Sequence, residues 1–314
     1  MTAVPRKAVP RRRTASARVP YAFLAPVVVL FTLMVLVPIG YTAYLSLRRV
    51  RVSGLGLGAG ARREVFVGLA NYRAALADSE FWAGVLRVLG YGAVVLPVML
   101  GLALVFALLL DSARARFRRF ARISIFLPYA VPVVIATLLW GFLYIPSLSP
   151  LQYLLRAAGL GEADLLGPGS VLYSIANIAV WGGTGFNMMV IYTQLTAIPR
   201  ELYESARIDG CSELRMALRI KIPLIVPALI MTTVFSMIAT LQVFNEPITL
   251  EPMTNAISGT WSPLMKITQD AFERDDIHSA AAASLLVAGM MLVLSLGFLR
   301  LVQSRAFGQE GPDR

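Results

Sequence analysis

Residues 88–110 read VLGYGAVVLPVMLGLALVFALLL, which is 23 consecutive positions without a charged side chain between Arg87 and Asp111. A helix needs about 20 predominantly apolar residues to cross the roughly 30 Å of hydrocarbon in a bilayer. Backbone N–H and C=O groups must be paired within the segment when lipid surrounds them, so the segment is expected to be helical. The stretch therefore predicts a transmembrane helix.

Five further windows of the chain lack charged side chains, namely residues 19–47, 123–155, 165–199, 222–245 and 279–299. We expect membrane spans near 21–47, 86–110, 123–145, 170–194, 223–244 and 280–300. The Pro- and Gly-rich stretch 146–169 predicts a loop. Only 15% of the residues are charged and 57% are hydrophobic, against about 25% and 45–50% in ordinary globular domains. The sequence predicts an all-α, polytopic membrane protein with about six transmembrane helices.

Lys and Arg in the loops predict the orientation, because cytoplasmic loops carry an excess of these residues. With the N-terminus inside, 19 Lys and Arg lie in cytoplasmic segments and nine in external ones. The first external loop carries six arginines and goes against the rule. Both termini are expected in the cytoplasm, and the net charge of +11 then reflects topology.

The expected organisation is a cytoplasmic basic tail (1–20), a transmembrane domain (21–302) and a cytoplasmic C-terminal tail (303–314). The tail sequence RKAVPRRRTASAR, residues 6–18, also has the charge to bind RNA or anionic lipid. Its role in setting the topology explains that charge without a partner, so no nucleic-acid partner is expected.

The loop between the fourth and fifth predicted spans, residues 199–223, reads PRELYESARIDGCSELRMALRIKIP. Pro199 suits the first turn of a helix, Gly210 a left-handed stop, and Ser212 the cap of a second helix. Arg200 and Glu204 are spaced to pair on one helical face. The segment predicts a helix, a glycine turn and a second helix. It could lie on lipid, but its acidic first half favours a protein partner.

This loop resembles the EAA loop of ABC-importer permeases, whose pattern is Glu-Ala-Ala, three residues, Gly, nine residues and Ile-x-Leu-Pro. The chain departs from the pattern only at Ser205 and Ile222. The resemblance implies a coupling helix that sits in a groove of a cytoplasmic ATPase, with Pro223 opening the next span. The implied coupling residues are Glu204, Ser205, Ala206, Asp209, Gly210, Ile220 and Pro223.

Three other stretches resemble the carbohydrate-type permeases, closest to the maltose and glycerol-phosphate type, and the resemblance covers roughly residues 20–305. They are FVGLANY at 66–72, Phe126-Leu127-Pro128 with Pro132 and Trp140, and Ala197-Ile198-Pro199. Those permeases usually carry Phe-Asp and a Gly-Gly-Pro turn after the fifth span. Here the residues are Phe244-Asn245-Glu246-Pro247. Because of this departure, the resemblance does not predict which sugar is transported.

Several kinds of chemistry are not expected of this chain. No Gly-Lys pair occurs, so there is no phosphate-binding Walker A loop, and ATP hydrolysis is expected on a partner subunit rather than on this chain. The glycine run at 54–60 has neither the P-loop nor the dinucleotide spacing. His278 is the only histidine and Cys211 the only cysteine, so no metal site, disulfide or cofactor is expected.

Polar side chains within spans are costly and indicate a candidate substrate pathway. Neutral hydrogen-bonding groups beside aromatic rings suit sugar hydroxyls and pyranose C–H surfaces, whereas an anion would call for Arg or Lys. Hydrogen bonds between packed helices are the alternative role for any one of them. The candidate residues are Trp181, Thr184, Asn187, Gln194, Ser236, Thr240, Gln242, Phe244 and Asn245.

These features together predict a multi-pass permease subunit of a binding-protein-dependent ABC sugar importer in the bacterial inner membrane. The implied partners are cytoplasmic ABC ATPase subunits, a second permease in a heterodimer, an extracytoplasmic sugar-binding protein and a small carbohydrate. One alternative keeps this machine and changes the cargo to a polyamine, phosphate or iron complex. Another is an ion-coupled secondary transporter or a channel. Ion coupling would need an intramembrane acid or base, and all six windows lack one.

Overall fold

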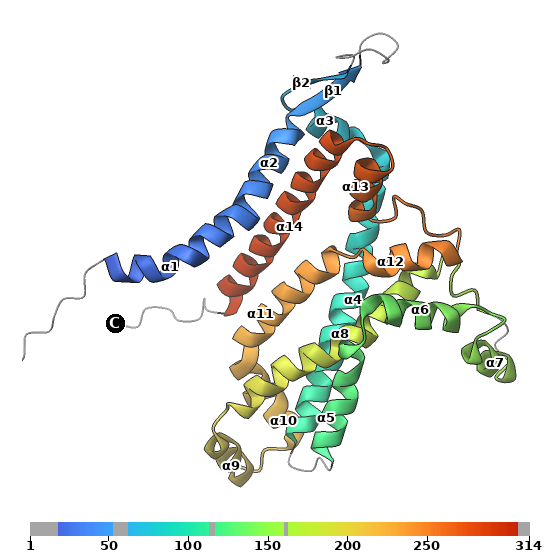
Figure 1. The fold of residues 1–314 in the computed structure, drawn as a ribbon. Coiled ribbons are helices and arrows are strands. Elements are labelled where there is room, and N and C mark those ends of the chain that lie inside the picture. Colours follow the sequence, from blue (N-terminus) through green and yellow to red (C-terminus); the bar gives the residue numbers. More distant parts are fainter. Residues whose placement is uncertain (1–17, 53–61, 113–116, 160–162, 307–314) are drawn as a thin grey trace, which may run out of the picture.

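The structure is a computed structural model that describes residues 18–52, 62–112, 117–159 and 163–306 (Figure 1). Most of the expected basic tail, the glycine run and most of the C-terminal tail lie outside these residues. The described chain is almost entirely helical, with one short antiparallel hairpin. The all-α fold class is confirmed.

Four helical segments of the described chain are long and apolar enough to cross a membrane, or five if one bent pair is a single span. They include α1 (Arg18–Phe31) running through a π turn into α2 (Val37–Ser46), α4 (Ser79–Asp111), α11 (Ile222–Leu241) and α14 (Ile277–Ala306). Helix α8 (Val171–Thr196) has 26 residues, about 39 Å at 1.5 Å per residue, but polar side chains lower its hydropathy. Helical segments therefore occupy all six predicted windows.

The third window is not the uninterrupted span that was expected at 123–145. It forms α5 (Arg118–Phe126), a 3-10 turn (η2, Leu127–Ala130) and α6 (Val133–Tyr144), and the two parts meet at 94°. Val131 is extended with ψ 127° and Pro132 caps α6 from outside with ψ 133°. A proline disfavours helical geometry in the residue before it, which explains why the chain turns here.

The loops that the sequence placed outside the cell contain more regular structure than the sequence indicated. Strands β1 (Arg48–Val52) and β2 (Arg62–Phe66) pair in an antiparallel hairpin, followed by α3 (Ala70–Ala77). The expected loop 146–169 contains α7 (Pro150–Ala157), because Ser149 accepts a hydrogen bond from the backbone N–H of Gln152 and caps it. In Figure 1 the hairpin and α13 (Pro263–Phe272) lie at the end opposite α9 (Arg200–Ile208).

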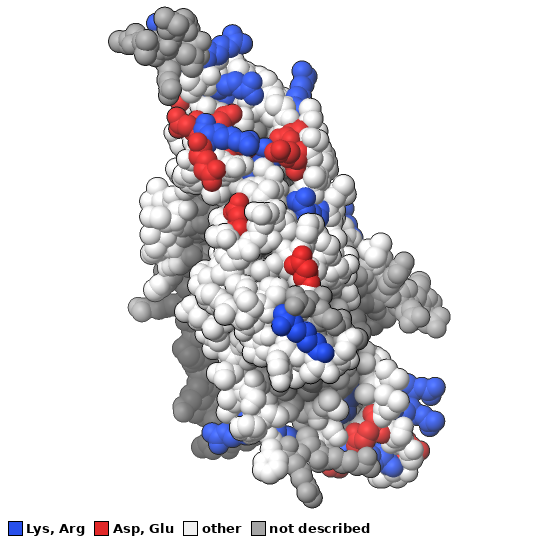
Figure 2. Space-filling model, turned by 90° about the vertical axis from the view of Figure 1, so that its right-hand side faces the viewer, with Lys and Arg blue, Asp and Glu red and all other residues white. Residues whose placement is uncertain are grey.

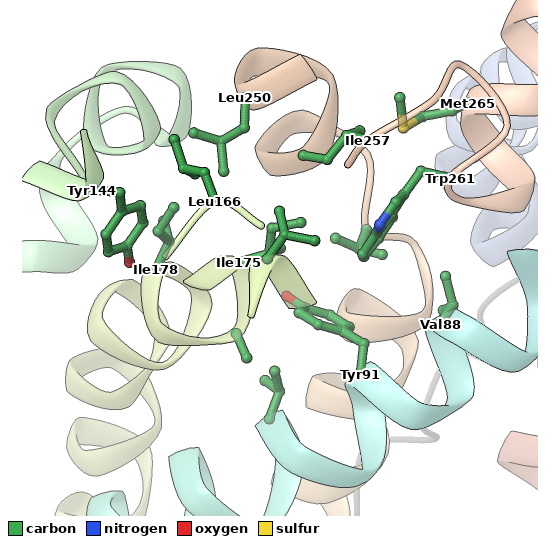
Figure 3. Close-up of a cluster of buried hydrophobic side chains, with 14 of the residues drawn as sticks. Val88, Tyr91, Tyr144, Leu166, Ile175, Ile178, Leu250, Ile257, Trp261 and Met265 are labelled. Atoms are coloured by element: carbon green, nitrogen blue, oxygen red, sulfur yellow. The ribbon is translucent and has the colours of Figure 1, made fainter. Parts of the chain in front are cut away.

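The core is built where α8 packs along α4, with α6 and α12 (Asn245–Leu250) closing one end. Figure 3 shows this cluster of buried side chains, in which Tyr91 and Trp261 meet edge to face at 6.4 Å between ring centroids. Arg87 donates to the Trp261 carbonyl and ties the loop before α13 to α4. The face drawn in Figure 2 carries most of its charged side chains near its two ends. Such a distribution suits a protein whose middle lies in lipid.

Candidate functional site

The segment after α8 forms the expected helix, glycine turn and second helix. Helix α9 begins at Arg200, directly after Pro199, which occupies the N-cap with ψ 135° rather than the first turn. Gly210 has φ +74° and ends the turn, as its left-handed conformation requires. Ser212 Oγ accepts a hydrogen bond from the Arg215 N–H and caps α10 (Glu213–Met216). These backbone signals place the turn as the sequence predicted.

Pro223 lies in the first turn of α11, and α11 continues without a break from α10 and a π turn (η3, Ala217–Lys221), so the three form one helical rod from Glu213 to Leu241. The expected pairing of Arg200 with Glu204 is wrong, because these two residues form no ion pair; among the described residues Arg207 pairs instead with Glu213 at 3.1 Å. That pair joins α9 to α10 across the glycine turn.

The π turn explains how a proline fits inside this rod. A proline donates no N–H bond, and its ring clashes with the carbonyl four residues earlier in a regular α-helix. The π turn ends at Lys221, two residues before Pro223. The π turn of the first span, η1 (Thr32–Leu36), ends likewise two residues before Pro38. In both places the wider turn precedes the proline, and the helix continues.

The exposed face of α9 contains part of the predicted coupling set. Glu204 and Ser205 are exposed, and Ile208 has 87% of its surface exposed although it is apolar. Ala206 is buried and packs inward instead. Leu214 of α10 is 70% exposed. An acidic side chain among uncovered aliphatic ones is typical of a protein-binding surface rather than a fully solvated one.

A buried charge cluster holds this segment against the rest of the fold. Lys221 Nζ lies 2.5 Å from Asp111 Oδ2 at the end of α4, and both side chains are almost fully buried. The same Nζ lies 4.9 Å from the ring centroid of Tyr203 in α9. Burial and then the nearby Asp111 carboxylate raise the pKa of Tyr203 to about 12. Three elements, α4, α9 and the rod, therefore meet at one lysine.

A cavity of about 1280 Å³ lies between α4, η2–α6, α8, α11 and α12. Its wall combines aromatic rings, aliphatic side chains and neutral polar groups. Seven of the nine residues expected on a substrate pathway line it: Asn187, Gln194, Ser236, Thr240, Gln242, Phe244 and Asn245. The structure thus brings the polar residues of the fourth and fifth windows to one space.

The two other candidates lie elsewhere. Trp181 packs edge to face on Trp140 at 5.9 Å between centroids and does not line the cavity. Thr184 is buried, and its Oγ1 donates to the Val180 carbonyl one turn earlier. Ser236 and Asn187 join neighbouring helices as well as lining the cavity, because Ser236 Oγ donates to Asn187 Oδ1 at 2.9 Å. This pair therefore has both roles that the sequence suggested, in the wall of the candidate pathway and in a hydrogen bond between packed helices.

Five of the lining residues that were absent from the predicted set are aromatic or charged. Four are aromatic: Tyr91, Tyr129, Phe186 and Phe235, of which Tyr129 and Phe186 stack at 4.8 Å. The fifth is Glu246, which was assigned to the loop after the fifth window and named only within the stretch that departs from the carbohydrate-type pattern. Its position directly after Phe244-Asn245 was the available signal. No group of three His, Cys, Asp or Glu that could hold a metal occurs in the described part of the chain.

Residues 99–305 match the protein family described as "Binding-protein-dependent transport system inner membrane component". The chain belongs to this family. The match covers the rod, the α9 turn and most of the cavity wall, and it makes the chain a multi-pass inner-membrane transport component rather than an enzyme.

Curated relatives match nearly the whole length of this family member. The sn-glycerol-3-phosphate transport system permease proteins UgpA of Agrobacterium fabrum and Salmonella typhimurium are each 28% identical over 290 residues. These matches cover 91% of this chain, with 95% and 94% of those proteins. A chain of a bacterial alginate ABC transporter, solved with an alginate pentasaccharide-bound periplasmic protein, matches with a TM-score of 0.78 at 21% identity. That match covers 93% of this chain and 96% of the other, and it shows the same fold.

Proposed function

We propose that this chain is a permease subunit of an ATP-driven importer of carbohydrates. The observation that carries the proposal is the continuous rod from Glu213 to Leu241. Its first turn adjoins the exposed face of α9, and its far part supplies Ser236 and Thr240 to the cavity. One rigid element therefore connects a surface suited to a protein partner with a space suited to a solute.

The partner at α9 is a cytoplasmic ABC ATPase, and residues 199–223 are the segment that couples to it. Glu204 and Ile208 supply an acid and an aliphatic contact on the exposed face. Ala206, which is buried, and Tyr203, which is half-buried, hold the helix in place. The turn at Asp209 and Gly210 sets the angle to α10. Ile220 and Pro223 act within the rod rather than at a contact surface.

The other partners follow from the family name and the exposed surface. A binding protein delivers the sugar to the end that carries the hairpin and α13. A second, different permease packs against this one and completes the pathway. The span from Tyr21 to Ser46 supports this pairing, since none of its most apolar window is buried within the chain. In this arrangement the coupling segment and both termini are cytoplasmic.

The sugar assignment is supported by the cavity wall and by the relatives. Amide and hydroxyl side chains can exchange hydrogen bonds with sugar hydroxyls, and the Tyr129–Phe186 stack offers an apolar face beside them. The names of the curated relatives specify glycerol-3-phosphate, and one solved transporter was crystallised with an oligosaccharide-bound periplasmic protein. Both names specify solutes with several hydroxyl groups.

Co-purification tests the coupling assignment. The permease is tagged and expressed with its partner subunits, and the amount of ATPase that elutes with it is measured. Glu204→Lys should reduce that amount at least about tenfold, because it places a cation where an acid is needed. Glu80→Lys, the same change on an exposed residue at the opposite end of α4, should leave it unchanged. Full retention of the ATPase by the Glu204 variant would refute the assignment.

A further inference from the structure

In the part of the chain that the structure describes, the cavity is lined by one charged side chain, Glu246, and by no Lys or Arg. We propose that the cavity passes uncharged carbohydrate and excludes anionic solutes, and that Glu246 sets this selectivity. The proposal rests on the proposed function and specifies its substrate class. It also separates the chain from relatives whose names specify a phosphate ester.

Glu246 is free to act on a solute. It lies in the first turn of α12, is half-buried, and lines the cavity beside Asn245 and Phe244. No ion pair between described residues includes it. In its ionised form this carboxylate therefore acts on the cavity, and no cation of the described part of the chain pairs with it to cancel its charge.

An anion would meet two penalties in this space. It would lose part of its hydration beside aliphatic walls without a cation to replace the water. It would also approach a like charge, whose repulsion is greater in a partly dry cavity than in bulk water. Both penalties are avoided by a neutral sugar, whose hydroxyl groups can donate to the Glu246 carboxylate and to the amide oxygens of Gln242 and Asn187.

The wall also matches the other surfaces of a sugar. Tyr129 stacks on Phe186 at 4.8 Å, and Phe235 is 64% exposed although it is apolar. All three line the cavity, so apolar ring surface and amide groups line the same space. Pyranose rings present C–H patches and hydroxyl edges together, and so require both kinds of wall. The volume of about 1280 Å³ exceeds that of typical small-molecule pockets, about 300–1,000 Å³, and accommodates an oligosaccharide.

Cysteine labelling measures the electrostatic selectivity without knowledge of the sugar. Cys211 is the only cysteine of the chain, so Cys211→Ser with Gln242→Cys places a single thiol of this chain in the cavity wall. The assembled importer is treated with a cationic trimethylammonium-ethyl or an anionic sulfonatoethyl methanethiosulfonate, and the labelling rates of this chain are compared. The rate ratio, cationic over anionic, is then measured again with Glu246→Gln added.

The ratio should be about tenfold higher with Glu246 in place than in the Glu246→Gln variant, from the interaction of unit charges several ångströms apart in water. An uncharged methanethiosulfonate should label both variants equally, which shows that the thiol is equally accessible. Ala158→Cys, on an exposed residue outside the cavity wall, should give a ratio that does not change with Glu246→Gln. Equal ratios in the two cavity variants would overturn the proposal.

A transport experiment supplies a second test. Proteoliposomes with the complete importer should take up no radiolabelled sn-glycerol-3-phosphate on addition of ATP. Uptake of that anion through the complex with Glu246 intact would also overturn the proposal. Neither result depends on the Glu204 experiment. If Glu204→Lys reduced ATPase binding but the importer took up the anion, the proposed function would stand and the selectivity proposal would fail.

Discussion

Lys221 Nζ lies 2.5 Å from Asp111 Oδ2, and this buried ion pair joins residues that are 110 positions apart in the chain. Asp111 is the last residue of α4, and Lys221 is the last residue of the π turn that leads into α11. Tyr203 of α9 covers the same ammonium group with its ring. The C-terminal end of α4 and the N-terminal end of α11, two helices that line the cavity, are thus fixed to each other next to the proposed coupling helix α9.

Removal of one member of this pair should be strongly destabilising. Lys221→Met leaves Asp111 buried without its cation, and the loss of one partner of such a pair costs about 3–5 kcal/mol. The double variant Asp111→Asn/Lys221→Met removes both charges and should recover much of that loss. Thermal unfolding of the purified complex, followed for the two single variants and the double variant, measures the coupling. Strictly additive losses would show that the pair contributes nothing.

Gly185 allows α8 to approach the C-terminal end of α5 more closely than other residues could. A Cβ at this position would lie 2.7 Å from the Phe126 Cα and closer still to the Ile125 carbonyl oxygen. Gly185→Ala should therefore force the two segments apart, at a cost of about 1–3 kcal/mol, as is typical of overpacking, or more. Thermal stability and expression of the folded protein report the change.

Gly182 is the matched control on the same helix, because a Cβ there would have no heavy atom within 4 Å. Gly182→Ala should leave the stability unchanged or raise it by up to about 1 kcal/mol, since alanine favours a helix. If both variants lost equal stability, the close approach at Gly185 would not be its cause.

The FVGLANY stretch owes its structural role to Asn71. Its side chain is fully buried, and Nδ2 donates to the Ser46 carbonyl at 2.8 Å and the Arg48 carbonyl at 2.7 Å. Asn71→Asp keeps the shape but replaces the donor with an acceptor. It should destabilise the junction of α2 and β1 by about 2 kcal/mol or more, the range for buried groups left unpaired.

Limited proteolysis and thermal unfolding measure this change. Tyr72→Phe removes a single hydrogen bond, between the Tyr72 hydroxyl and Ser46 Oγ at 2.7 Å, and should cost about 1 kcal/mol. Arg73→Ala changes an exposed neighbour and should have no effect. The hydrogen-bonding account fails if the aspartate variant is as stable as the Arg73 variant.

Asp78, which pairs with Lys266 of α13, makes this end of the fold sensitive to acid. Burial alone would raise the pKa of Asp78, but hydrogen bonds from Lys266 and from the backbone N–H of Glu80 outweigh it and hold that pKa below its usual value. A carboxyl group whose pKa is lowered by folding stabilises the fold above its unfolded pKa of about 3.9. That stabilisation is lost as the pH falls through the folded value.

The melting temperature should therefore fall more steeply between about pH 5 and pH 3 in the native protein than in Asp78→Asn. Because Asp78 is partly exposed, the difference should be a few degrees. Glu80→Gln changes an exposed carboxyl group on the same turn and should keep the native pH dependence. An identical acid profile for the native protein and Asp78→Asn would contradict this account.

Local signals in the sequence predicted the α9 turn well, whereas the third window shows what such signals miss. Pro199, Gly210 and Ser212 each restrict the backbone at one position, and the structure has a cap, a left-handed residue and a second cap there. The length of a window without charged residues does not show whether the helix within it is straight or bent. Pro132 explains why the helix is interrupted, but the angle of 94° between its two parts also depends on how both parts pack on α8, which the sequence does not show.

The cavity wall was predicted in part for a related reason. Residues spaced three or four apart share a helical face, and this placed Asn187 and Thr184 together. Helix α8 packs on several neighbours, so a shared face does not tell which residue meets the cavity and which meets protein. Glu246 was missed because a charge at the edge of an apolar window was assigned to the loop, and only the path of α12 turns it toward the cavity.

The π turn at Ala217–Lys221 sets the rotational phase between the two ends of the rod. It adds one residue to a helical turn, and each residue of an α-helix advances the direction of the side chains by about 100°. If one residue of this turn were lost, the face that carries Ser236 and Thr240 would rotate away from the cavity while Leu214 kept its position beside α9. A single inserted residue therefore matches the angular position of the solute-facing wall to that of the distant surface that contacts a partner.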